Sequence, residues 1–240
     1  MIEPIDLTFI SSAAKTLDDI ESARISASLR LQQLTRQGPD ADGQIRGAGF
    51  SEFHPSVMRQ QELLEHLKRT EDLQAHFLSL LVQDSPFRPW VARTRGVGLR
   101  QAGRLLAATG DPYVAERVLK VEGVIQHVET GPRTKREFLT YCGYGLDQDG
   151  RSRRHRRGQR SNWNSDARMR AHLIAVSAMR ARGGGPLRDL YVETRAKELA
   201  KVDTGHAHAR ALRRVAKQVL GDLFDEARCI HERDAVASSA

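Results

Sequence analysis

Apolar residues recur every three or four positions along the first third of the chain, which predicts two long helices. The first covers residues 10–36 and contains no glycine or proline. The second covers about 56–83 and follows Pro55. Residues 37–55 hold several glycines, so we expect a linker between the helices. The apolar positions are Ile10, Ala13, Ala14, Leu17, Ile20, Ala27, Leu31 and Leu34 in the first helix, and Leu63, Leu73, Phe77, Leu80 and Leu81 in the second.

These two helices predict an N-terminal, coiled-coil-like helical arm over residues 1–88, with its linker near 37–55. The arm is expected to form an antiparallel hairpin or to join copies of the chain. Two amphipathic helices packed on the main domain would show the same pattern, and the sequence leaves both interpretations open.

Shorter helical patterns fill most of the remaining chain, so the predicted fold class is mostly α. The last helix has the clearest spacing of apolar residues. The helix before the glycines at 183–185 is expected to begin at the cap Ser165, with Met169, Leu173, Ile174 and Val176 on or near one face. The predicted helices cover about 99–108, a short segment capped by Thr134, 165–182, 187–201 and 207–231.

The segment 113–136 has the least regular pattern. Its valines, leucine and isoleucine fit either short strands or a helix interrupted by Gly123. Residues 89–232 as a whole are expected to form one domain. Residues 233–240 are small and polar at their end and predict a disordered tail.

Composition places the chain among folded proteins, because 40% of its 240 residues are hydrophobic and 28% are charged. The formal net charge is +8. Two cysteines and no Cys-x-x-Cys pair predict free thiols. The acidic N-terminus lacks the pattern of a signal peptide, and no apolar run is long enough to span a bilayer. We therefore expect a cytoplasmic protein with no membrane partner.

The positive charge is concentrated in one segment. Eight of the twenty residues from 151 to 170 are arginine, and Asp166 is their only acidic neighbour. Such a segment can be a solvated loop, a site for an acidic partner or a nucleic-acid clamp, and its density and single sign favour nucleic acid. Asn162 and Trp163 close it with amide donors and a ring for stacking. The arginines are Arg151, Arg153, Arg154, Arg156, Arg157, Arg160, Arg168 and Arg170.

A second candidate site is the sequence Gly96-Val97-Gly98, which resembles the turn of a helix-hairpin-helix motif. Glycines in such a turn leave backbone N–H groups bare at a helix N-terminus, where a phosphate can approach. Arg100 and Arg104 follow one turn apart and would face the same backbone. A tight turn between helices, without a ligand, is the alternative.

Metal and cofactor chemistry has little support in the sequence. His206, His208, His231 and Cys229 include no second close pair that would complete a tetrahedral zinc site. Asp147 and Asp149 could hold a divalent cation, but turn residues that balance the arginines explain them better. We predict no metal site and no cofactor.

Several segments, taken in order, resemble the C-terminal helix-hairpin-helix domain of insertion-sequence transposases related to the pilin-gene invertase. The resemblance covers about residues 90–231. It rests on Gly96-Val97-Gly98 through Gly110-Asp111-Pro112-Tyr113, on Phe138-Leu139-Thr140-Tyr141-Cys142-Gly143-Tyr144-Gly145, on Arg157-Gly158-Gln159-Arg160-Ser161-Asn162-Trp163-Asn164, on Ala167-Arg168-Met169-Arg170 and on Ala211-Leu212-Arg213 with Lys217.

In that family an RNase-H-like DEDD domain with four magnesium-binding acidic residues precedes the coiled coil, and a serine of the last domain is thought to join the DNA. Residues 1–90 resemble the coiled-coil region alone. Asp149 stands where the family's serine is expected, and the nearest hydroxyls, Ser152 and Ser161, are weak catalytic candidates. Mg²⁺ is expected only if another chain supplies a catalytic domain.

The resemblance implies a DNA-binding protein of transposition or recombination, similar to a truncated transposase. Its expected partners are DNA, a guide-like RNA and further copies of the chain. The alternatives are an active serine-dependent recombinase, which would use Ser152 or Ser161, and a regulatory DNA- or RNA-binding protein without catalysis.

Overall fold

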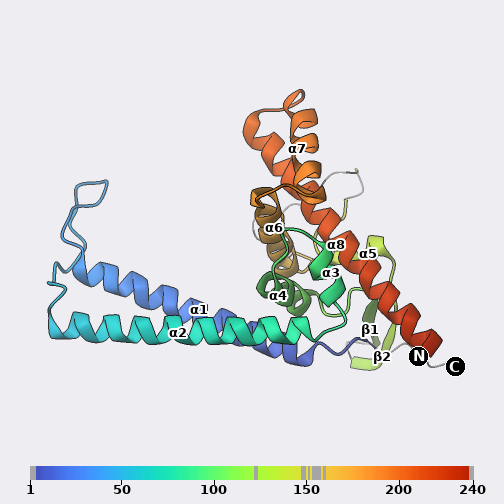
Figure 1. Cartoon of the computed structure of the whole chain (residues 1–240), viewed down its shortest axis with the longest axis horizontal. Helices are drawn as coiled ribbons and strands as arrows, with labels where there is room; N and C mark the ends of the chain where they lie inside the picture. Colours follow the sequence, from blue (N-terminus) through green and yellow to red (C-terminus); the bar gives the residue numbers. More distant parts are fainter. Residues whose placement is uncertain are drawn as a thin grey trace. The chain divides into compact units, whose positions relative to one another are not determined.

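The computed structural model is mostly helical, as the sequence predicts (Figure 1). It describes residues 4–121, 124–146, 150, 152, 158 and 161–237. Its elements are α1 (Thr8–Thr35), α2 (Pro55–Gln83), α3 (Arg88–Arg93), α4 (Leu99–Thr109), β1 (Val114–Val121), β2 (Val124–Pro132), α5 (Lys135–Tyr141), α6 (Ser165–Arg180), α7 (Pro186–Leu199) and α8 (Thr204–Ala237).

The chain divides into two compact units. Ser12–Leu80 form the first, here called the arm. Met1–Ser11 and Leu81–Ala240 form the second, here called the C-terminal unit. The arm is thus shorter at both ends than the predicted 1–88, because the start of α1 and the end of α2 belong to the C-terminal unit.

Within the arm, α1 and α2 lie side by side and run in opposite directions (Figure 1). The side-chain amide of Gln74 donates to the backbone carbonyl of Ala13 over 3.0 Å. The guanidinium of Arg24 pairs with the carboxylate of Glu71, a residue that is only 7% exposed. Arg24 and Glu71 therefore form a charged layer inside the seam between the two helices.

The buried face of α2 differs from the predicted one. Val57, Leu64, Glu71 and Leu78 are buried and recur every seven residues, the spacing of one coiled-coil position. The predicted face is wrong, because Leu63, Leu73, Phe77 and Leu80 are exposed. Glu71 occupies one of the seam positions, which hides the repeat from a search for apolar residues.

The charged layer leads to a prediction about the stability of the arm. Replacing Glu71 with alanine leaves Arg24 partly buried without its carboxylate, and we expect a loss of about 1–3 kcal/mol. Replacing both residues with leucine should restore or exceed the original stability. Hydrogen exchange of α1 and α2 amides measures both changes. The control Lys68→Ala removes an exposed pair with Glu65 and should leave exchange unchanged; an equally large effect of that control would contradict the assignment.

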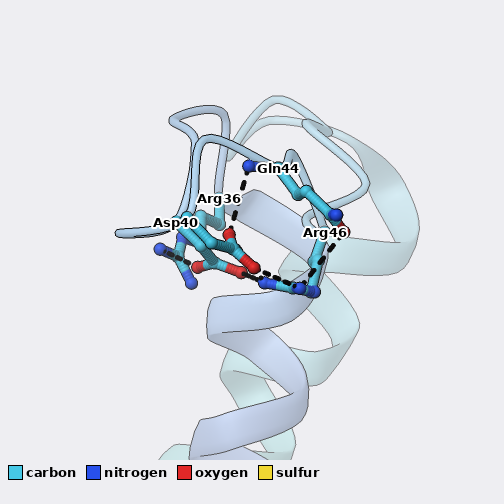
Figure 2. Close-up of polar contacts among 5 residues, drawn as sticks. Arg36, Asp40, Gln44 and Arg46 are labelled. Carbon is cyan, nitrogen blue, oxygen red and sulfur yellow. Dashed lines mark hydrogen bonds and ion pairs between the residues drawn. The ribbon is translucent and has the colours of Figure 1, made fainter.

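The loop between α1 and α2 is organised by ion pairs (Figure 2). One guanidinium nitrogen of Arg46 lies 2.6 Å from Asp40 and the other lies 2.6 Å from Asp42. Arg36 also pairs with Asp40, and Arg46 donates to the side chain of Gln44. The segment predicted to be a linker therefore carries its own polar network.

In the C-terminal unit, α8 is the helix on which the others assemble. Helices α3, α5, α6 and α7 pack on it, and α4 packs on α6. The apolar pattern predicted for α8 is confirmed, since all of its predicted positions are buried: Leu212, Val215, Ala216, Val219, Leu220 and Leu223. The helix continues to Ala237, beyond its predicted end at 231, while residues 238–240 lie outside the described part of the chain.

The buried face of α6 consists mainly of alanine rather than of large apolar residues. Met169 and Leu173 were expected to be on this face but are exposed. Alanines have no bulk beyond Cβ, so neighbouring helices can approach closely. The N-cap is Asn164, whose side chain accepts from the backbone of Ala167, and not the predicted Ser165. The buried residues are Ala167, Ala171, Ile174, Ala175 and Ala178.

The irregular segment after α4 forms an antiparallel hairpin of β1 and β2. This outcome agrees with the strand interpretation of 113–136. Thr134 and Glu137 then form a capping box at the start of α5, as the sequence predicts. Within the described part of the chain, no helix combines the length and apolar character that crossing a bilayer requires.

A buried carboxylate connects three segments of this unit. Asp111 accepts hydrogen bonds from the backbone N–H groups of Ile5, Tyr113 and Val114 at 2.7, 2.8 and 3.1 Å. The carboxylate also bonds to the side chain of His231 on α8, with 2.7 Å between the carboxylate oxygen and Nε2. Asp111 thus links the N-terminal segment, the start of β1 and the last turns of α8.

Candidate nucleic-acid interface

The turn between α3 and α4 depends on Gly96. Its φ of +93° lies in the left-handed region that favours glycine. A Cβ atom at this position would come within 2.6 Å of the Cα of Ala178 on α6. Gly96 therefore allows the turn to pack closely on α6.

Gly98 has a different environment from Gly96. It is the N-cap of α4, in extended conformation, and a Cβ atom here would meet nothing within 4 Å. The first turn of α4 thus begins in open space. Arg100 and Arg104 follow one turn apart on α4, and both are partly exposed. The phosphate contact at this hairpin stays a prediction.

Most of the arginine-rich segment lies outside the described residues: Arg151, Arg153, Arg154, Arg156, Arg157 and Arg160, together with Asp147 and Asp149. Two arginines of the predicted run are described. Arg168 lies in the first turns of α6, and Arg170 pairs with Asp166 over 3.2 Å.

Trp163 is half-buried beside a glycine that gives it room. A Cβ atom on Gly143 would lie 2.6 Å from Cδ1 of the indole. The guanidinium of Arg168 lies 5.5 Å from the centre of the Trp163 rings, a cation–π distance. The indole therefore contacts Arg168. Asn162, the residue before Trp163, is exposed.

Asn164 fixes the start of α6 to neighbouring elements. Besides capping α6, its side-chain amide donates to the carbonyl of Ala108 over 2.7 Å and to the hydroxyl of Tyr141 over 2.8 Å. The start of α6, one turn before Arg168, is therefore held by α4 and α5.

A basic stretch of α8 was not among the sites predicted from the sequence. No acidic residue lies between Asp203 and Asp222. Among the residues that the structure describes, Arg213, Arg214 and Lys217 have no carboxylate within ion-pairing distance. Lys217 lies one turn after Arg213 on the same helix. The sequence signal for this stretch was its lack of acidic residues. The apolar pattern of α8, however, indicated only a helix that packs in the core.

Arg213 approaches Arg168 next to an aromatic ring. Its guanidinium lies 5.0 Å from the centre of the Tyr144 ring. Burial and the positive charge of Arg168 lower the pKa of Arg213. Burial raises the pKa of Tyr144 to about 12, so the phenol is neutral near pH 7 and adds no negative charge. The Tyr144 hydroxyl lies 3.4 Å from the backbone carbonyl of Arg168. Tyr144 thus contacts both the guanidinium of Arg213 on α8 and the backbone of Arg168 on α6.

A hollow of about 540 Å³ lies between the α3–α4 turn, α7 and α8. Its lining includes Arg95 as well as the carboxylates of Asp222 and Asp225. Burial raises the pKa of Asp222, and the carboxylate accepts from the side chain of Gln218. Because its acids repel phosphate, this hollow is less suited to nucleic acid than the cations of α8.

The histidines that could have suggested a metal site have other partners. His231 bonds to Asp111, His208 to the hydroxyl of Tyr191, and His206 to Asp203. Over the described ranges, no group of three or more metal-ligating side chains occurs. Cys229 is exposed and Cys142 is buried, and neither forms a disulfide. Burial raises the pKa of the Cys142 thiol to about 12.

The candidate nucleophiles lie near the arginine-rich segment. Ser152 pairs with Leu146 in an isolated antiparallel bridge, and Ser161 lies three residues before the cap of α6. In the part of the chain that the structure describes, neither hydroxyl bonds to a histidine or a carboxylate. The geometry therefore adds nothing to the catalytic hypothesis.

Comparison of the chain with protein-family models, with curated proteins and with solved structures finds no match in any of the three.

Proposed function

We propose that this protein binds DNA through its phosphate backbone and acts in transposition or recombination. The proposal assigns binding, without strand cleavage by this chain. Its biological setting rests on the order of motifs that resembles the insertion-sequence transposases. Its binding chemistry rests on the charges of the C-terminal unit.

The observation that carries the proposal is the set of cations on α8 that no carboxylate of the described residues neutralises. Arg213, Arg214 and Lys217 come from adjacent turns of one helix. Fixed positive charge of this kind releases counterions from DNA when it meets phosphates. The arginine-rich segment that precedes α6 in sequence adds to the same charge.

Binding of this type is insensitive to sequence and sensitive to salt. Each phosphate contact contributes about −0.9 to the slope of log K against log salt on duplex DNA. The open N-terminus of α4, with Arg100 and Arg104, is proposed as a second backbone contact. Neither contact reads bases, so specificity would come from another chain or from a guide-like RNA.

The test removes two of the α8 cations. Arg214→Gln combined with Lys217→Gln should weaken binding to a random duplex about 10-fold and reduce the salt slope by roughly 2. Fluorescence anisotropy at several salt concentrations measures both quantities. The control Arg228→Gln, near the other end of α8, removes an exposed pair with Glu232 and should change neither. An unchanged slope in the double variant would remove α8 from the interface.

We also propose that the arm joins copies of the chain. The support is the row of exposed apolar residues on α2, where Leu73 is 72% and Phe77 48% exposed, since monomeric proteins rarely leave such side chains together in water. Leu73→Glu with Phe77→Glu should yield monomers in analytical ultracentrifugation while helix content is kept. A wild-type chain that is monomeric at all concentrations would contradict this part.

A further inference from the structure

The hollow between the α3–α4 turn, α7 and α8 is large enough to hold a small molecule. Its volume of about 540 Å³ lies within the range of about 300–1,000 Å³ that is usual for ligand pockets. The part of its lining that comes from α7 is apolar and consists of Pro186, Leu187 and Leu190. The hollow therefore offers an apolar surface beside polar and charged side chains, which are Arg93, Thr94, Arg95, Gln218, Asp222 and Asp225.

Two of these charged side chains are neutralised by partners from neighbouring helices. Arg93 at the end of α3 pairs with Glu226 of α8, a residue that is 6% exposed. Asp225 of α8 pairs with Lys135 of α5 over 2.5 Å. Each of these ion pairs joins a helix to α8, so both belong to the packing of the unit rather than to a ligand site.

Asp222 is a half-buried carboxylate with a neutral partner. Its Oδ1 accepts from the side-chain amide of Gln218 over 2.8 Å. Over the described ranges, no hydrogen bond or ion pair involves its Oδ2. Burial is the largest cause that raises the pKa of Asp222, because it separates the charged form from water. An ammonium group placed at Oδ2 would supply the counterion that the carboxylate lacks.

Arg95 brings a positive charge to the same hollow. Its guanidinium donates to the backbone carbonyl of Arg182 over 3.3 Å, and a Cβ atom on Gly185 would lie 3.2 Å from its Cδ. The side chain therefore lies along the glycines that precede α7. Among the described residues, no carboxylate pairs with Arg95, and Asp222 lies too far away to do so. A guanidinium has five N–H donors, so donors remain for the carboxylate of a ligand.

We propose that this hollow binds a zwitterionic small molecule, whose ammonium group pairs with Asp222 and whose carboxylate pairs with Arg95. The alkyl chain between the two charges would lie along Leu187 and Leu190, where it loses contact with water. A ligand with only one charge would pair with one of the two residues and be repelled by the other. The inference goes beyond the proposed function, because neither residue belongs to the proposed DNA contacts.

The experiment compares ligands of equal length that carry one charge or both. The full-length chain, labelled with ¹⁵N, is titrated with β-alanine, γ-aminobutyrate and ε-aminocaproate, and with the alkylamine and the alkanoate of each chain length. The side-chain amide of Gln218 reports binding, because it donates to Asp222. For at least one chain length, the zwitterion should bind about 10-fold more tightly than either single-charge counterpart, the effect of one additional charge-assisted contact.

Two variants each remove one charge of the site. In Asp222→Asn the zwitterion should bind no more tightly than the alkanoate. In Arg95→Gln it should bind no more tightly than the alkylamine, while Arg95→Lys should keep part of the preference because the charge remains. The matched control Asp189→Asn changes an exposed carboxylate of α7 outside the hollow and should keep the wild-type preference.

The unfolding curve from tryptophan fluorescence checks that each variant is folded. Zwitterions that bind no more tightly than the alkylamines would assign the hollow to simple cations and overturn the proposal. Zwitterions that bind no more tightly than the alkanoates, or no binding of any ligand in the series, would overturn it as well. A zwitterion preference that persists in folded Asp222→Asn would remove Asp222 from the site.

Discussion

Replacing Gly96 with alanine is expected to destabilise the C-terminal unit by about 2–5 kcal/mol. Two physical causes add together. Alanine is disfavoured at a φ of +93°, and its Cβ would lie 2.6 Å from the backbone of Ala178. Because backbone cannot rotate away as a long side chain can, the α3–α4 turn would have to separate from α6.

Gly98→Ala is the matched control for this change. Its backbone is extended and the space around it is open, so we expect a cost below about 1 kcal/mol. Urea denaturation followed by tryptophan fluorescence measures both variants, since Trp90 and Trp163 belong to the C-terminal unit and are the only tryptophans. Equal midpoints for the two variants would contradict the packing of Gly96 on α6.

Asp111→Ala is expected to cost about 3–5 kcal/mol, because three backbone N–H groups and His231 lose their buried acceptor together. Its side chain is 2% exposed, so water cannot simply take the place of the carboxylate. Thermal unfolding of the full chain should show the loss, together with faster hydrogen exchange at Tyr113 and Val114.

Two further variants identify the cause of the Asp111 effect. Asp111→Asn keeps the size and one acceptor oxygen and should lose less stability than the alanine variant. Glu193→Ala removes a carboxylate that pairs with Lys197 on the exposed side of α7 and should have little effect. Stability that is similar in Asp111→Ala and wild type would show that these hydrogen bonds are not maintained in solution.

The helices were predictable because their local signals agree with their packing. Thr134 and Glu137 formed the expected capping box, and α8 buried every apolar position predicted for it. The seam of α2 was not predictable from apolar spacing, because Glu71 lies in the seam and is neutralised by Arg24 from another helix. Partners that are distant in sequence leave no local pattern.

The candidate site was predictable only in part. The glycines of the α3–α4 turn were recognised, but their different roles depend on whether α6 is nearby, which only the fold determines. Arg213 looked like one polar position of an amphipathic helix. Its significance comes from Arg168 and Tyr144, which two separate segments bring beside it. Whether a charged side chain has a counterion depends on the folded arrangement.

The central claim is that the protein makes a multi-phosphate contact with DNA. The most direct test is fluorescence anisotropy of the purified chain on a labelled random duplex, from about 50 to 300 mM salt. If five to seven cations meet phosphates, log K should fall with log salt with a slope of roughly −4 to −6, at micromolar or tighter affinity. No binding at the lowest salt, or a slope near zero, would contradict the claim and assign the basic residues to another kind of partner.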